Sequence, residues 1–142
     1  MQASVVWEHD LNFGGTAGSG ALLPLASSIS PGGGSFSPME LLLVGLAGCT
    51  AMDVISILKK KGQKISRFEV RVRAERASGH PRVFTRAALE YWVGAQGVDP
   101  ATVERAIELS TTRYCSVHAM LGKVFPISHS CQVEELPAEP LP

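Results

Sequence analysis

The segment from Leu41 to Leu58 constrains the fold of this chain more than any other stretch, because as a helix it would be apolar on nearly every side. Only three of its residues are polar: Thr50, Asp53 and Ser56. A run of 18 such residues is at the threshold for a membrane span. Asp53 would then lie deep in lipid, however, and amphipathic strands follow, so we expect no membrane partner. A helix of this kind in a water-soluble protein must be covered on every side.

The size of the chain bears on what covers that helix. A chain of 142 residues is about one domain, which leaves little to wrap an all-round apolar helix. We therefore predict that a second copy of the chain covers it, in a homodimer. The 13 basic residues balance the 13 acidic ones, which suits an oligomer better than a lone monomer. A net charge of zero is also a poor match for phosphate backbones, so no nucleic-acid partner is expected.

The ends of the long helix and the other elements follow from local signals. Ser37, Pro38 and Glu40 have the spacing of a capping box, and Gly62 marks the C-terminal end. Alternating apolar and polar residues predict strands at residues 3–9, 67–75, 83–93 and 126–134. Asp99 is followed by Pro100, so the same signal, a capping residue and then a proline, predicts the start of a second helix.

This order of elements predicts an α+β fold, with antiparallel sheets and a long buried central helix. Residues 12–15 and 18–20 are expected to be turns, because they are rich in glycine. The core face of the strand at 83–93 is expected to carry alternate residues: Val83, Thr85, Ala87, Leu89, Tyr91 and Val93. One domain spans residues 1–142, and three prolines leave its tail unstructured from about residue 136.

The chain has three cysteines, which are too few and too odd in number for a disulfide scaffold. The N-terminus has neither the basic start nor the apolar run of a secretory signal, so we expect a cytoplasmic protein. Thiols kept in a reducing compartment are catalytic, metal-binding or simply packed.

Cys49 lies in the middle of the apolar helix, next to Gly48 and one turn after Gly45. Glycine inside a helix costs roughly 1 kcal/mol relative to alanine. Either another backbone packs tightly there, or a ligand must reach the Cys49 sulfur; the alternative is a cysteine packed as a small hydrophobic residue. Burial and the nearby Asp53 both oppose a thiolate, so a reactive Cys49 needs a positive charge or a donor from elsewhere.

Cys115 is better placed for activation. It follows helix-breaking residues and is expected to open a short helix ending at Leu121, where free N–H groups lower the pKa of a thiol. The alternative is a cysteine packed at a helix junction. Cys131 alternates with apolar residues on the last strand, which favours a core position.

Two histidines extend these cysteines into a candidate zinc set within 17 residues: Cys115, His118, His129 and Cys131. Structural zinc sites usually hold their paired ligands on tight knuckles, and none is present here, so we expect no metal. The sequence also lacks phosphate-binding and dinucleotide-binding motifs, so no cofactor is expected.

Two segments together are similar to the OsmC/Ohr superfamily of osmotically inducible and organic hydroperoxide resistance proteins. The first is Ser37-Pro-Met-Glu-Leu-Leu-Leu-Val-Gly-Leu-Ala-Gly-Cys49-Thr-Ala-Met-Asp. The second, Tyr114-Cys115-Ser-Val-His, places its cysteine 66 residues after the first. The resemblance spans nearly the whole chain and is closest to a less characterised branch with a Cys-Ser-Val-His motif. It implies an OsmC-like α+β fold in which two chains interlock around their long helices.

The resemblance also implies a peroxidase cycle that defends against oxidative stress. Cys49 would attack an organic hydroperoxide and become a sulfenic acid, and Cys115 would resolve it as a disulfide. A small thiol or lipoylated partner would then reduce the disulfide. The alternative is an OsmC-like dimer without peroxidase activity that binds a small apolar or thiol ligand at its interface.

The chain departs from the family pattern at three positions. Family peroxidases carry an N-terminal arginine, whereas this chain has no arginine before Arg67. Their glutamate stands directly after the proline, where this chain has Met39, so Glu40 is either the catalytic glutamate displaced by one position or only the helix cap. Ser116 stands where a proline usually follows the second cysteine.

Overall fold

Two three-stranded sheets and one long helix make up most of the computed structural model, which describes residues 1–27 and 33–137. The chain divides into two units, residues 1–42 and 43–142. The first holds an antiparallel sheet in the order β1-β2-β3. Its strands are β1 (Ala3–His9), β2 (Asn12–Ala17) and β3 (Leu22–Ala26).

The glycines at residues 12–15 were expected to form a turn, and that expectation is wrong. Gly14 and Gly15 lie within β2 and pair with both neighbouring strands. A Cβ at Gly14 would meet Glu8 Oε1 at 3.1 Å, and one at Gly15 would meet Leu25 Cδ1 at 3.3 Å. Glycine here makes room for neighbouring side chains. The turn falls instead at Asp10, which has a positive φ of 46°.

Helix α1 (Pro38–Lys60) begins and ends as its sequence predicts. Glu40 Oε2 accepts a hydrogen bond from the Ser37 N–H at 2.8 Å, and the Glu40 N–H donates to Ser37 Oγ at 3.1 Å. These two bonds form the predicted capping box. At the other end Gly62 has a φ of +72°, and the Gln63 N–H donates to the Leu58 carbonyl at 3.0 Å. Such a left-handed residue after a helix favours glycine.

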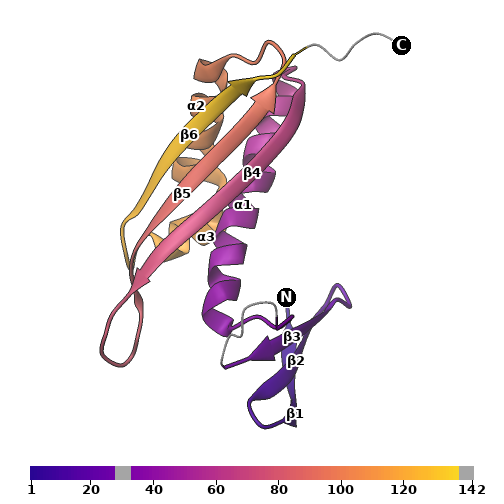
Figure 1. Cartoon of the computed structure of the whole chain (residues 1–142), viewed down its shortest axis with the longest axis vertical. Helices are drawn as coiled ribbons and strands as arrows, with labels where there is room; N and C mark the ends of the chain where they lie inside the picture. Colours follow the sequence, from indigo (N-terminus) through magenta and orange to yellow (C-terminus); the bar gives the residue numbers. More distant parts are fainter. Residues whose placement is uncertain (28–32, 138–142) are drawn as a thin grey trace. The chain divides into compact units, whose positions relative to one another are not determined.

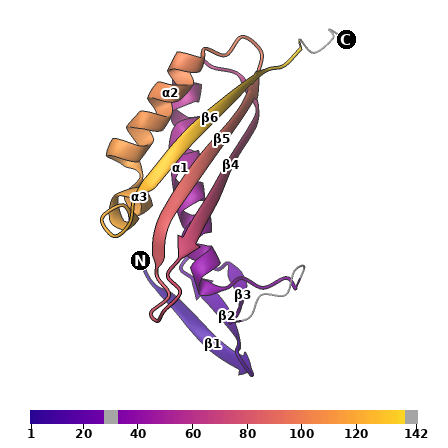
Figure 2. The same cartoon turned by 60° about the vertical axis from the view of Figure 1, so that its left-hand side comes forward.

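The second unit contains a sheet in the order β4-β5-β6, with the helices on one face of it (Figures 1 and 2). Its elements are β4 (Ile65–Arg76), β5 (Phe84–Ala95), α2 (Pro100–Leu109), the π-helical turn η1 (Ser110–Tyr114), α3 (Ser116–Leu121) and β6 (Ile127–Glu135). Strands β4 and β5 are antiparallel, but β5 and β6 are parallel. The predicted antiparallel pairing therefore holds for β1–β2–β3 and for β4–β5, and it is wrong for β5–β6. The helical connection carries the chain back to the start of β5, as parallel pairing requires.

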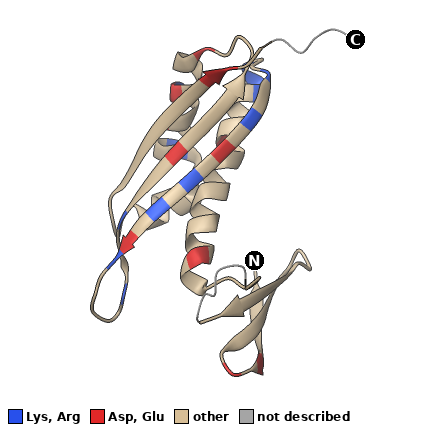
Figure 3. Ribbon diagram, viewed as in Figure 1, with Lys and Arg blue, Asp and Glu red and all other residues tan. Residues whose placement is uncertain are grey.

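The core of the second unit lies between this sheet and the helices. Leu89, Tyr91 and Val93 of β5 are buried as predicted, and they pack with α1 and α2 in one apolar cluster. At the start of β5 the predicted alternation is wrong: Phe84 is buried, while Val83 is exposed, as is Thr85. The β4–β5 register shifts at this point, which changes the face that each side chain occupies. Figure 3 shows that β4 carries both basic and acidic residues along its length.

One chain covers only a single face of α1. Its buried residues lie four apart along one stripe: Leu46, Thr50, Val54 and Leu58. Val44 is 52% exposed and Met52 is 76% exposed, so the helix is not covered on all sides by the described residues of one chain. By length and composition α1 could also cross a membrane, but the core helix of a water-soluble protein passes the same test.

The C-terminal tail follows β6. Residues 136 and 137 have no regular secondary structure, although the Leu136 N–H donates to the Ala95 carbonyl at 2.9 Å. The Leu136 side chain also packs over Gly94, where a Cβ would meet it at 3.1 Å. The predicted unstructured tail beyond these residues, 138–142, lies outside the described part of the chain.

Candidate active site

Cys115 is positioned by a change of helix type. At η1 the Cys115 N–H donates to the Ser110 carbonyl at 2.8 Å, five residues back. Such π turns insert an extra residue and change which way the following side chains point. Cys115 itself is extended and caps α3, where its Sγ accepts a hydrogen bond from the His118 N–H at 3.3 Å. The predicted short helix after Cys115 is therefore confirmed.

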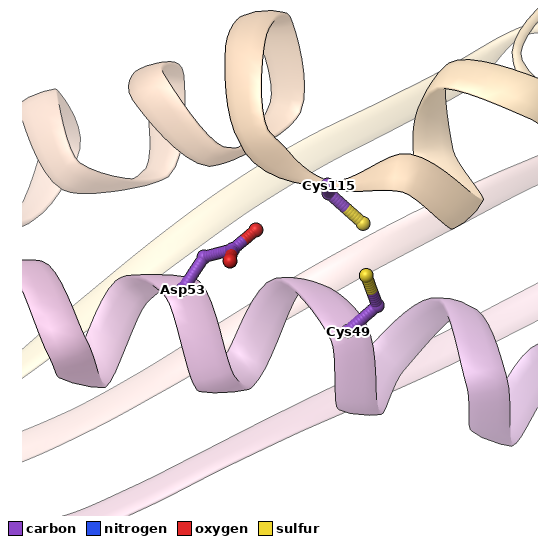
Figure 4. A group of neighbouring side chains, drawn as sticks. All are labelled: Cys49, Asp53 and Cys115. Carbon is purple, nitrogen blue, oxygen red and sulfur yellow. The ribbon is translucent and has the colours of Figure 1, made fainter.

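Cys49 faces Cys115 from the middle of α1 (Figure 4). The two Sγ atoms and a carboxylate oxygen of Asp53 all lie within 4.8 Å of one another. Cys49 Sγ also lies 3.8 Å from Ser116 Oγ, within hydrogen-bond distance for sulfur. Cys115 is buried, whereas Cys49 and Asp53 are half-buried. Two thiols that are 66 residues apart in sequence thus meet at one partly open position.

The two thiols differ in acidity. Burial raises the pKa of the Cys49 thiol, but hydrogen bonds from the Val117 backbone N–H and two neighbouring side chains outweigh it, so this pKa lies below its usual value. Burial raises the pKa of Cys115 to about 11. The charge of Asp53 raises the pKa of Cys49, as expected from sequence, and it raises the pKa of Cys115 as well. Of the two thiols, Cys49 is therefore the one that ionises more readily.

Cys115 was expected to be the more readily activated thiol, and the pKa directions reverse that expectation. Its position at the start of α3 does supply an N–H donor, but burial has the larger effect. The donor that Cys49 needed is the Val117 N–H. A backbone group has no signature in the sequence, so only the fold could identify it.

A chain of buried hydroxyl groups, which sequence reasoning missed, leads to Asp53. Thr50 Oγ1 lies 2.7 Å from the Tyr91 hydroxyl and 2.7 Å from Ser110 Oγ, and Ser110 Oγ donates to Asp53 Oδ2 at 3.0 Å. Burial raises the pKa of Tyr91 to about 12, so its hydroxyl stays protonated. The available signal was a polar residue at each of these core positions. The hydroxyl chain, defined as Tyr91, Thr50 and Ser110, fixes the carboxylate beside the two sulfurs.

No side-chain cation balances this carboxylate among residues 1–27 and 33–137. Asp53 takes part in none of the ion pairs found there, and no lysine or arginine shifts the pKa of Cys49 or Cys115. Within one chain, the described residues therefore place no lysine or arginine side chain at the two thiols.

Glu40 lies in the first unit and forms the capping box with Ser37. Its predicted catalytic role remains a prediction. The two glycines beside Cys49 have open space around them: a Cβ at Gly45 or Gly48 would meet no other atom within 4 Å. Tight backbone packing at these glycines is thus absent within the described residues of one chain.

The candidate zinc set is not assembled within the described part of the chain. The one group of three or more potential ligands found there is Cys49, Asp53 and Cys115. His129 instead packs edge-on against Tyr91, with ring centroids 6.3 Å apart. Cys131 packs against the apolar core, and burial raises its pKa to about 11.

The sequence of the chain matches a known protein family and a known protein. Residues 31–130 match the family model described as OsmC-like protein. The chain is 40% identical over 133 residues to Protein YhfA of Escherichia coli K12, covering 94% of this chain and 98% of that protein.

Two crystal structures share the fold at low sequence identity. The OsmC-like protein from Mycoplasma pneumoniae aligns with a TM-score of 0.83 at 16% identity, covering 94% of this chain and 96% of that one. The organic hydroperoxide resistance protein OhrB of Bacillus subtilis aligns with a TM-score of 0.62 at 14% identity, covering 93% and 98%. At such identities the likeness concerns the fold alone.

Proposed function

The chain belongs to the OsmC-like protein family, and from that premise we propose that it reduces organic hydroperoxides with Cys49 and Cys115. The observation that carries the proposal is the pair of sulfurs no more than 4.8 Å apart, with a lowered pKa at Cys49 and a raised pKa at Cys115. A peroxidase of this kind needs one thiol that ionises readily, because the thiolate is the nucleophile, and a second thiol close enough to form a disulfide with the resulting sulfenic acid.

In the first step the Cys49 thiolate attacks the terminal oxygen of the hydroperoxide. The O–O bond breaks, Cys49 becomes a sulfenic acid, and the alkoxide takes up a proton to leave as an alcohol. The sulfur is oxidised by two electrons and the peroxide is reduced by two. The half-buried position of Cys49 is suited to this step, because a small molecule must reach the sulfur.

In the second step Cys115 displaces the hydroxyl of the sulfenic acid. A sulfur–sulfur bond forms and water leaves with the thiol proton of Cys115. An external dithiol such as a lipoylated protein, or two molecules of a small thiol, then reduce the disulfide and are themselves oxidised to a disulfide. Cys49 is attacked within its own chain, so no second protein is needed until this reduction.

The proposal includes a homodimer in which the two chains interlock around α1. Two observations support it: the exposed apolar side chains of Val44 and Met52 on α1, and those of Val5, Val6 and Trp7 on β1, each more than half exposed. Exposed apolar side chains that are neighbours on one element are typical of an interface. We place the dimer in the cytoplasm, in defence against oxidative stress.

The experiment is to mix reduced protein with cumene hydroperoxide and to count free thiols. The expected loss is two of the three thiols per chain, and the Cys131→Ser control should also lose two. Cys49→Ser should lose none by this route, and Cys115→Ser should retain a sulfenic acid that dimedone traps. If the thiols survive excess hydroperoxide, the peroxidase proposal is wrong. The open space beside Gly45 and Gly48 would then favour the alternative function, binding of a small apolar or thiol ligand.

A further inference from the structure

Cys49, Cys115 and Asp53 also have the chemistry of a metal-binding set. Thiolate sulfur and carboxylate oxygen are ligands that zinc and similar thiophilic divalent cations accept together. The three donor atoms lie within 4.8 Å of one another and come from two elements of one unit, α1 and the turn before α3. Hard cations such as magnesium prefer oxygen ligands alone, so two sulfurs argue against them.

The charge at this position favours a cation. Three acidic groups converge there, and among the described residues no lysine or arginine pairs with Asp53 or shifts the pKa of either thiol. Two thiolate sulfurs and a carboxylate oxygen within 4.8 Å of one another would repel one another unless a positive charge lay between them. A divalent cation would supply it.

The carboxylate also has the support that metal ligands require. Ligating carboxylates are held by hydrogen bonds from a second layer of residues. Ser110 donates to Asp53 Oδ2 at 3.0 Å, and Ser110 is itself held by Thr50 at 2.7 Å. Both hydroxyl residues are fully buried, so the orientation of Asp53 is fixed from within the core.

We propose that the reduced protein binds a thiophilic divalent cation, of which Zn²⁺ is the type, through Cys49, Cys115 and Asp53. Ligand distances of about 2.3 Å to sulfur and 2.0 Å to oxygen in a tetrahedral site put the sulfurs about 3.8 Å apart. The separations of up to 4.8 Å therefore need only a small closure of the side chains. Three protein ligands leave the fourth position open to water or a small thiol.

Metal binding and disulfide formation exclude each other, because both use the same two sulfurs. When a hydroperoxide oxidises the metal-bound pair, the two thiolates give up two electrons, the O–O bond breaks, and two protons are taken up. The products are the disulfide, an alcohol, water and the free cation. The oxidation state of the pair thus decides whether the cation is held.

The test is an anaerobic titration of the reduced protein with Co²⁺, followed by competition with Zn²⁺. We expect one Co²⁺ per chain with the near-ultraviolet charge-transfer absorption of cobalt–thiolate bonds, and displacement by Zn²⁺ with a Kd below about 1 µM. Cys49→Ser and Cys115→Ser should each weaken binding at least tenfold and reduce that absorption. Asp53→Asn should weaken binding while leaving both cobalt–sulfur bonds. Cys131→Ser is the matched control and should bind as the unaltered protein does.

The measurement on oxidised protein uses the unaltered sequence, so it tests the metal-binding proposal even if a variant fails to fold. Protein oxidised with diamide should bind no cobalt, and reduction should restore binding. The inference is overturned if reduced protein shows no thiolate absorption, if oxidised protein binds equally well, or if Cys131→Ser removes the site. No hydroperoxide enters the titration, so its failure is distinguishable from failure of the proposed peroxidase activity.

Discussion

The buried hydroxyl chain makes a specific prediction about stability, because its hydrogen bonds can run in only one direction. The Ser110 hydroxyl donates to Asp53, so its proton is already used and it must accept from Thr50. Thr50 in turn must accept from Tyr91, since each hydroxyl has a single proton to donate. The order of donation is therefore Tyr91 to Thr50 to Ser110 to Asp53.

Replacing Thr50 by valine keeps the shape of the side chain but removes the middle of this order. The Tyr91 hydroxyl, which lies 2.7 Å from Thr50 Oγ1, then becomes a buried donor without an acceptor, at a cost of about 1–3 kcal/mol. Loss of the bond to Ser110 adds about 1 kcal/mol. We expect Thr50→Val to lower the free energy of unfolding by about 2–4 kcal/mol. At about 3 °C per kcal/mol for a chain of this length, Tm should fall by roughly 6–12 °C.

Tyr91→Phe supplies the matched control. This change removes the hydroxyl donor itself, so no buried donor is left without an acceptor. It should lower the free energy of unfolding by only about 0.5–1.5 kcal/mol. In the double variant no unpaired hydroxyl remains at position 91. The combined loss of unfolding free energy should therefore be smaller than the sum of the two single losses by about 1–2 kcal/mol. Urea unfolding of reduced protein, followed by far-ultraviolet circular dichroism at one fixed protein concentration, measures all four forms. A neutral Thr50→Val, or strictly additive losses, would refute the assigned order of donation.

Three further predictions concern the thiols and the helix cap. Iodoacetamide near neutral pH should alkylate Cys49 before Cys115 or Cys131, because the pKa of Cys49 is lowered while those of the other two are raised to about 11. Peptide mass spectrometry over a pH series identifies the order of alkylation, and equal rates at the three cysteines would contradict the prediction. Asp53→Asn should speed alkylation of Cys49 at neutral pH, because loss of the carboxylate charge lowers the pKa of that thiol and raises its thiolate fraction; a slower reaction would show that this charge does not oppose the thiolate. Ser37→Ala should lower the free energy of unfolding by about 1 kcal/mol, because it removes the side-chain acceptor of the capping box; an unchanged urea midpoint would count against that contribution.

Local chemistry made parts of this fold predictable. The capping box at Ser37 and the end of α1 at Gly62 depend on neighbours within a few residues, and both are confirmed. The strand at residues 12–17 was missed because Gly14 and Gly15 are typical of turns. Their place in β2 depends on Glu8 and Leu25, whose side chains come close only after the sheet has formed.

The two cysteines of the candidate site could be predicted from the sequence, but which of their thiols ionises more readily could not. The family resemblance brought Cys49 and Cys115 together, and their sulfurs do meet. Which of the two ionises depends on burial and on a backbone donor, the Val117 N–H, and neither can be read from residue types. The parallel pairing of β6 was missed for a related reason. Alternation along a strand is more typical of antiparallel than of parallel sheets, but β6 is a half-exposed strand at the edge of its sheet and alternates although it is parallel to β5.

Asp53 links the two proposals made for this site. An anionic group beside a reactive thiol opposes the thiolate, so its presence works against the first step of peroxide reduction. The same group, fixed by Ser110 and the hydroxyl chain, favours any cation that binds the two sulfurs. If both proposals hold, Zn²⁺ should slow the consumption of hydroperoxide by the reduced protein, and a chelator should restore it. Asp53→Asn should speed the uninhibited reaction and weaken the inhibition together, because one charge accounts for both.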